Sequence, residues 1–105
     1  MDIRQLKYFI AVAEEQNFGR AAERLHRSQP PLTRQIQTLE EELGVQLFRR
    51  TAKGVELTQA GEVLQRDAMN ILALVKQATE RAQRAAKGQI GILDVGVYGS
   101  SSLNT

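Results

Sequence analysis

The chain contains no cysteine, and aromatic residues make up only 5% of it. The lack of cysteine excludes disulfide bonds, thiolate zinc sites and cysteine nucleophiles, and it is compatible with a reducing cytoplasm. Long apolar runs are also missing, because the longest, from 71 to 75, is far too short to cross a bilayer. No charged-then-apolar signal peptide opens the sequence either. We therefore expect a soluble, cytoplasmic protein without a membrane partner.

The elements of an enzyme active site are missing as well. The single histidine, His26, has no second histidine with which to share a metal, so a place in a turn or beside a phosphate is expected for it. No glycine-rich phosphate loop, pair of catalytic acids or serine elbow is present. The sequence accordingly predicts no catalytic residue, no metal site and no cofactor, and the chain is not expected to be an enzyme.

Charge is uneven along the chain. A net charge of +2 does not by itself indicate a nucleic-acid partner. Between residues 20 and 34, however, four arginines accompany a single acid, Glu23, while acids are concentrated elsewhere, at 14–15 and 40–42. A second basic cluster lies at 49–53. This distribution predicts a locally basic surface that attracts phosphates. Scattered, solvated charge is the alternative interpretation.

The spacing of the apolar residues predicts that this chain of 105 residues is mainly helical. Residues 2–16 follow the i, i+3, i+4 pattern of a helix, and Asn17 is a suitable N-cap for a second, short helix to about Leu25. Ser28 is expected to cap a third helix that starts with two prolines and ends at Gly44.

A hairpin and a long helix are expected to follow. Val45–Arg49 and Val55–Leu57 have the pattern of two short strands, with Arg50–Gly54 as the turn between them. Thr58 is expected to cap a helix that runs to about Lys87, with Gly88 as its stop.

Apolar residues in the long helix alternate spacings of four and three, which predicts a heptad seam between two helices. Tyr8 and Val12, one turn apart on the first helix, form a second apolar strip that needs a partner. The predicted homodimer interface consists of Tyr8, Val12, Leu64, Ala68, Ile71, Val75, Ala78 and Ala82. Three domains are thus expected: 1–58, the linker helix 59–88, and 89–105, the first strand and tail of a missing domain.

The third helix has a polar, acid-poor face at its start, opposite its leucine stripe. Arginine can bridge guanine, glutamine can pair with adenine, and threonine offers a methyl group to thymine in the major groove of duplex DNA. The predicted base-contacting residues are Gln29, Pro30, Thr33, Arg34 and Gln37. Backbone contacts, which add affinity and salt dependence, are predicted for Ser28, Arg49, Arg50 and Lys53.

From Met1 to about Gly88 the sequence resembles the N-terminal domain of the LysR-type transcriptional regulators. The resemblance lies in Leu6-x-x-Phe9, Phe18-x-x-Ala21-Ala22-x-x-Leu25-His26-x-Ser28-Gln29-Pro30, Gln35-Ile36-x-x-Leu39-Glu40, Leu43-Gly44-x-x-Leu47-Phe48-x-Arg50 and Leu57-Thr58-x-Ala60-Gly61.

The resemblance implies a winged helix-turn-helix followed by a linker helix that dimerises antiparallel. It further implies a C-terminal domain, similar to periplasmic binding proteins, that holds a small-molecule inducer and of which only the strand at 90–97 is expected here. The family's base-contacting positions carry over to Gln29, Pro30, Thr33 and Arg34, and its wing positions to Arg50 and Lys53. Gly19 departs from the family, where threonine or serine is common, and lacks their hydroxyl.

The sequence hypothesis is sequence-specific binding of double-stranded DNA by a dimeric bacterial transcriptional regulator, with activation or repression, and dimer or tetramer, left open. The alternative hypothesis is a protein–protein interaction module that uses the winged helix and the heptad helix as docking surfaces.

Overall fold

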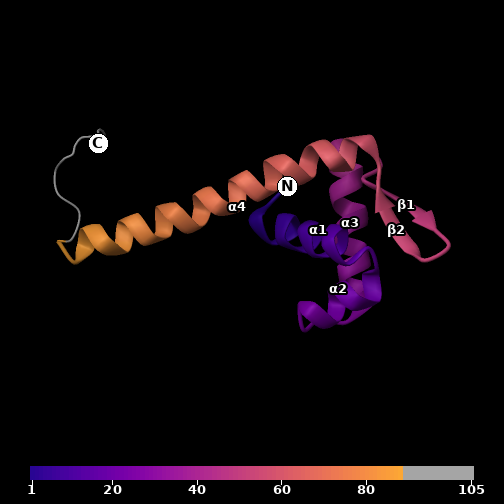
Figure 1. Ribbon diagram of the computed structural model, residues 1–105, viewed down its shortest axis with the longest axis horizontal. Helices are drawn as coiled ribbons and strands as arrows, with labels where there is room; N and C mark the ends of the chain where they lie inside the picture. Colours follow the sequence, from indigo (N-terminus) through magenta and orange to yellow (C-terminus); the bar gives the residue numbers. More distant parts are fainter. Residues whose placement is uncertain (89–105) are drawn as a thin grey trace. The chain divides into compact units, whose positions relative to one another are not determined.

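The computed structural model describes residues 1–88, which form four helices and one two-stranded sheet (Figure 1). The elements are α1 (Ile3–Glu15), α2 (Phe18–Arg24), α3 (Gln29–Leu43), β1 (Phe48–Thr51), β2 (Gly54–Leu57) and α4 (Gln59–Ala86). This is the expected mainly helical architecture of a winged helix-turn-helix followed by a long helix. The strand predicted at 90–97 and the tail behind it lie outside the described residues.

The first two helices begin at residues whose side chains bond to free backbone N–H groups. Asp2 accepts the N–H of Gln5 at 2.8 Å, and the Gln5 side chain accepts the N–H of Asp2 at 3.1 Å, so α1 starts with a capping box. Asn17 accepts the N–H of Arg20 at 2.8 Å, which confirms it as the N-cap of α2.

A tight turn joins α2 to α3. His26 lies in this turn with a φ of 56°, a left-handed conformation that is uncommon for residues with a side chain. The predicted place of His26 in a turn is therefore confirmed. The N–H of Arg27 donates to the carbonyl of Ala22 at 2.9 Å and closes the turn. Because of this closure, α3 follows α2 directly, as a helix-turn-helix requires.

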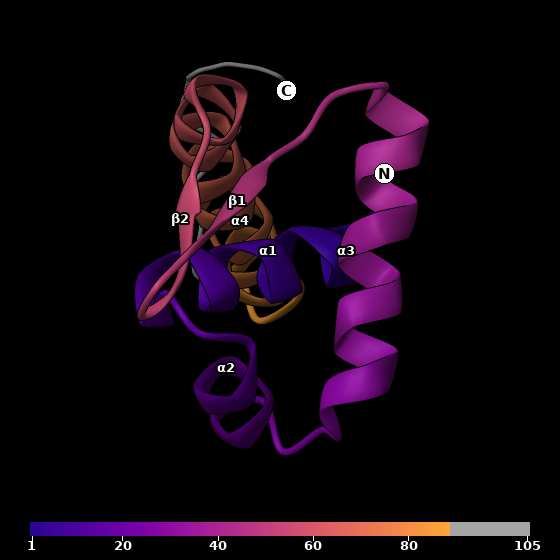
Figure 2. The same ribbon diagram turned by 90° about the vertical axis from the view of Figure 1, so that its right-hand side faces the viewer.

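The core of the first part of the chain is shared by all of its elements. Helix α1 contacts both α3 and the hairpin strand β2, and α2 packs against α1 and α3 (Figure 2). The buried apolar side chains are Leu6, Phe9, Ile10, Ala11, Val12, Ala21, Ala22, Leu32, Ile36, Leu39, Leu47, Phe48, Val55 and Ala68. Complete burial of one large apolar side chain stabilises a fold by about 1.5–3 kcal/mol, so this cluster holds the helices and the hairpin together.

The hairpin is antiparallel, and its register pairs Phe48 with Leu57 and Thr51 with Gly54. The first strand begins three residues later than the predicted start at Val45, since Val45 and Gln46 are exposed and belong to the loop after α3. Arg50 was predicted in the turn, but it lies inside β1, and only residues 52 and 53 remain between the strands. The predicted hairpin is therefore confirmed, but its turn is shorter.

The described residues divide into two compact units by their internal contacts, Met1–Leu72 and 73–88. The first unit extends beyond the predicted boundary at residue 58 because the start of α4 packs on the core through Ala68. Thr58 caps α4 as predicted, accepting the N–H of Gly61 at 3.1 Å. Within residues 1–88 no helix is both long enough and apolar enough to cross a membrane.

Candidate nucleic-acid interface

Helix α3 buries one face and exposes the other. Leu32, Ile36 and Leu39 are 1%, 2% and 0% exposed, so the leucine stripe faces the core as expected. On the outer side the five side chains predicted to contact bases are accessible: Thr33 is half-buried, and the exposed ones are Gln29, Pro30, Arg34 and Gln37. The polar face of α3 is therefore accessible at the N-terminal end of the helix.

The entry to α3 is free of capping side chains. Ser28 occupies the N-cap position, as predicted, but its side chain makes no capping hydrogen bond and is exposed. Pro30 lies in the first turn, where a missing N–H costs nothing because that group has no helical partner. The remaining free N–H groups and the helix dipole give this end a partial positive charge, which favours a nearby phosphate.

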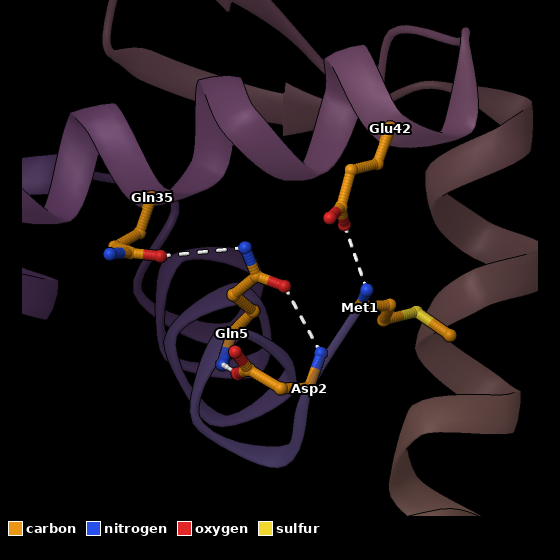
Figure 3. Close-up of polar contacts among 5 residues, drawn as sticks. All are labelled: Met1, Asp2, Gln5, Gln35 and Glu42. Atoms are coloured by element: carbon orange, nitrogen blue, oxygen red, sulfur yellow. Dashed lines mark hydrogen bonds and ion pairs between the residues drawn. The ribbon is translucent and has the colours of Figure 1, made fainter.

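Polar contacts from the start of the chain hold α3 against α1 (Figure 3). The amide of Gln5, only 5% exposed, donates to the side-chain oxygen of Gln35 at 3.4 Å. The N-terminal ammonium group of Met1 lies 2.8 Å from the carboxylate of Glu42. These contacts connect α3, at Gln35 and at Glu42, to α1 and to the residue at the start of the chain.

Glu40 connects α3 to the hairpin. One of its carboxylate oxygens, Oε2, accepts the backbone N–H groups of Leu47 at 2.7 Å and of Phe48 at 3.3 Å. Sequence reasoning placed Glu40 in an acidic stretch and in the motif of the resemblance but gave it no role, because no local pattern reveals a partner in a following loop. Its effect is to fix the distance between α3 and β1, and thereby between the two parts of the candidate interface.

The hairpin is also anchored at its tip. The N–H of Val55 donates to the carbonyl of Gln16 at 3.1 Å, in the turn between α1 and α2. Gly54 has a φ of 149°, and a Cβ at this position would lie 2.2 Å from that same carbonyl oxygen. Only glycine allows so close an approach, so the sequence at residue 54 sets how near the hairpin comes to α1.

The three basic residues of the hairpin are all exposed but differ in their surroundings. Arg49 pairs with Glu56, its neighbour on β2, at 2.7 Å between Nε and Oε1. The guanidinium carbon of Arg50 lies 5.8 Å from the ring centroid of Phe18. Lys53 lies in the two-residue turn. Among the described residues neither Arg50 nor Lys53 forms an ion pair.

A groove of about 370 Å³ separates α3 from the hairpin. Its lining includes Thr33 and Gln37 from the exposed face of α3, and Arg49 and Arg50 from β1. Two of the side chains predicted for base contacts and two of those predicted for backbone contacts thus border one depression of the surface. A strand of duplex DNA that lay in this groove would have side chains of α3 on one side and side chains of the hairpin on the other.

One part of the predicted basic surface is neutralised. Arg24 lies 2.8 Å from a carboxylate oxygen of Glu14 and 3.4 Å from one of Glu15, and Arg20 lies 4.0 Å from Glu15. The hydrogen bond to Glu14 raises the pKa of Arg24 above its usual value. The sequence placed these acids apart from the arginines, but the end of α1 meets α2 and brings them together. On the α3 side, Arg27 and Arg34 form no ion pair within residues 1–88.

Two of the residues predicted at the dimer interface are in the core instead. Val12 and Ala68 are both 0% exposed, so neither can contact a second chain. Leu64 and Ile71, and also Tyr8, are half-buried and pack against the core. The helical spacing was correct, but α1 and the start of α4 use part of these faces within their own chain. Three predicted residues of α4 are exposed, Val75, Ala78 and Ala82.

Comparison with known families gives a match over residues 3–62 to the family described as bacterial regulatory helix-turn-helix protein, lysR family. The HTH-type transcriptional regulator TfdT of Cupriavidus pinatubonensis (strain JMP 134 / LMG 1197) is 56% identical over 105 residues. ClcR of Pseudomonas putida, also named an HTH-type transcriptional regulator, is 54% identical over 105 residues. All of this chain is aligned in both cases, but it spans 46% of TfdT and 36% of ClcR.

Among solved structures, the chain is similar to the crystal structure of the CbnR DNA-binding domain in complex with DNA. The TM-score is 0.79 at 55% identity, and the alignment covers 82% of this chain and 99% of the CbnR domain. At this level of identity, the two chains share the fold of both the helices and the hairpin.

Proposed function

This chain belongs to the lysR family of bacterial regulatory helix-turn-helix proteins, and we propose that it binds duplex DNA sequence-specifically as a dimeric transcriptional regulator. In this proposal α3 enters the major groove by its N-terminal end, while the hairpin reaches the backbone or the minor groove beside it. The CbnR domain, solved with DNA, supports this function over a protein-docking module.

The groove between α3 and the hairpin is the observation that carries the proposal. Thr33 and Gln37 border it on one side and Arg50 on the other, so a single DNA strand would meet base-reading and phosphate-binding side chains together. We assign base reading to Gln29, Pro30, Thr33, Arg34 and Gln37. Backbone contacts are assigned to Ser28, Arg50 and Lys53, with a smaller contribution from Arg49 because Glu56 neutralises its charge.

Fluorescence anisotropy tests this function directly. The chain is titrated against labelled inverted-repeat and random duplexes of equal length, each at two salt concentrations. We expect tighter binding to the inverted repeat, and a loss of affinity on both duplexes as salt increases. Equal affinity for both duplexes would contradict sequence reading, and binding that ignores salt would contradict phosphate contacts.

The proposed dimer uses the exposed residues of α4. Leu74 is 58% exposed and Val75 is 41% exposed, and the small side chains of Ala78 and Ala82 follow at helical spacing. Exposed apolar side chains on one helix gain stability when a second helix covers them. A two-fold dimer would present two copies of α3 to half-sites about 34–36 Å apart.

Sedimentation measures this dimer. Val75→Glu should shift the chain to monomer, because it places a charge among apolar side chains. Gln77→Glu, two residues along the exposed part of α4, introduces the same charge on the opposite side of the helix and should leave the dimer intact. A persistent Val75→Glu dimer would exclude this surface. The C-terminal inducer domain, tetramers of the whole protein and a cytoplasmic location remain predictions.

A further inference from the structure

Phe18, the first residue of α2, lies beneath the guanidinium group of Arg50 in the hairpin. The distance from the guanidinium carbon to the ring centroid is 5.8 Å, within the range of a cation–π contact. The two residues are far apart in the sequence and belong to different elements. Their contact therefore joins the helix-turn-helix to the wing at the border of the groove, which both side chains line.

The ring of Phe18 is itself held in place. It packs edge-on against Phe48, with centroids 6.0 Å apart and an interplanar angle of 67°. Phe48 in turn packs against Phe9 at 5.3 Å, and Phe9 is 0% exposed. The Asn17 cap fixes the backbone directly before Phe18. A continuous row of rings thus runs from the core to the surface, and its outermost face supports Arg50.

The strand that carries Arg50 is fixed as well. Alternate residues of a strand face opposite sides, so Arg50 shares the side of Phe48. Val55 is paired with Arg50 on β2 and is 4% exposed. The Val55 N–H that bonds to Gln16 ties this side of the hairpin to the helices. Both partners of the stack are consequently anchored before any ligand arrives.

A stack orients an arginine differently from an ion pair. Arg49 is oriented by Glu56, and this carboxylate both neutralises the charge and occupies the Nε donor. Phe18 contacts Arg50 through its ring face, which leaves the N–H donors at the edge of the guanidinium group available for phosphate or base oxygens. Arg50 therefore retains its full charge and its donors in a restricted orientation.

We propose that Phe18 is a positioning residue for DNA binding, which holds Arg50 ready to contact the strand that enters the groove. This inference rests on the proposed function, since it assigns to Phe18 a role within that interface. Binding is favoured because a pre-oriented arginine loses less side-chain freedom when it meets DNA than one that moves freely in solvent.

A double-mutant cycle on the inverted-repeat duplex tests the role. Phe18→Leu keeps an apolar side chain but removes the ring face, and we expect it to weaken binding by about two- to fivefold, the range of an exposed cation–π contact. In an Arg50→Ala background the same change should have no further effect. Phe18→Tyr, which keeps the ring, should bind like the unaltered chain. Equal losses in both backgrounds, or a Tyr variant as weak as the Leu variant, would overturn the positioning role.

Proton NMR of the unbound chain separates this inference from the proposed function. The ring current of Phe18 should shift the Arg50 side-chain protons upfield, and Phe18→Leu should abolish the shift while thermal unfolding confirms that the variant is folded. Absence of the shift in the unaltered chain would overturn the stack even if Phe18→Leu does not fold. If the Arg50 protons show the upfield shift but the chain binds no duplex, the proposed function is rejected, and with it the role of Phe18 in DNA binding.

Discussion

Two regions of the first unit carry basic side chains but use them differently. Where α1 meets α2, Arg20 and Arg24 lie beside Glu14 and Glu15, and their charge is balanced within the chain. Around the start of α3 and along the hairpin, the cations Arg34 and Arg50, with Lys53, form no ion pair among the described residues. We infer that only the second region attracts phosphates strongly.

The comparison teaches that pairing in space, more than the count of charges, decides where a polyanion binds. An exposed ion pair contributes little to stability, but it removes a cation from the field that an approaching phosphate experiences. A chain with a net charge of +2 can thus present one basic side, because Glu14 and Glu15 are placed against the arginines of the other.

Arg34→Ala, in the unpaired region, should have the largest effect on DNA binding. If Arg34 bridges a base, its loss costs about 1–3 kcal/mol on the inverted-repeat duplex and much less on a random duplex. Anisotropy titrations of both duplexes measure the difference. Arg24→Ala removes the same type of side chain from the paired region and serves as the matched control. An equal loss on both duplexes would show that Arg34 contacts phosphate and reads no base.

Lys53→Ala should have a smaller and less selective effect. A lysine in the hairpin turn that contacts one phosphate adds affinity on any sequence. Its loss should therefore weaken both duplexes alike and lower the slope of log K against log salt concentration by about 0.9. Titration over a series of salt concentrations measures this slope, and an unchanged slope would remove Lys53 from the proposed contacts.

Glu56→Gln should convert a paired arginine into an unpaired one. Without the carboxylate, Arg49 gains a free charge beside the groove, and we expect tighter binding to both duplexes together with a steeper salt dependence. Glu23→Gln removes the same negative charge from α2, where no ion pair to Glu23 exists among the described residues. If both variants gain the same affinity for DNA, the change in net charge and not the release of Arg49 is responsible.

Local patterns predicted most of the fold, because helix ends and apolar stripes depend on residues close in sequence. The caps at Asn17 and Thr58 were correct for this reason, as was the stop at Gly44. The exposed face of α3 also followed from spacing alone, since its buried stripe fixes which side remains outside.

Contacts between distant elements could not be predicted in the same way. Val12 and Ala68 have the spacing of an interface, but whether such a residue faces its own core or a partner depends on how α1 and α4 pack. Glu40 shows the same limit, since its partners at the start of β1 are set by the loop after α3. The stack of Arg50 on Phe18 was missed because it requires the position of the hairpin.

Arg24→Ala should have the smallest effect on DNA binding among these variants, because it lies in the paired region. Because the pair with Glu14 is exposed, its loss should cost less than about 1 kcal/mol of unfolding free energy. The pKa of Arg24 is raised in the folded chain, so the contribution of the pair is complete below the usual arginine pKa and is lost only as pH rises through the folded-state value.

The decrease in Tm of Arg24→Ala should therefore be constant between neutral and mildly alkaline pH, which thermal unfolding can measure. The salt slope for DNA binding should match that of the unaltered chain, because an arginine already engaged by Glu14 and Glu15 releases no counterions from DNA. A slope lowered as far as in Lys53→Ala would mean that Arg24 leaves its acids for a phosphate. The contrast between a paired and an unpaired region would then fail, and the basic surface would extend over α2.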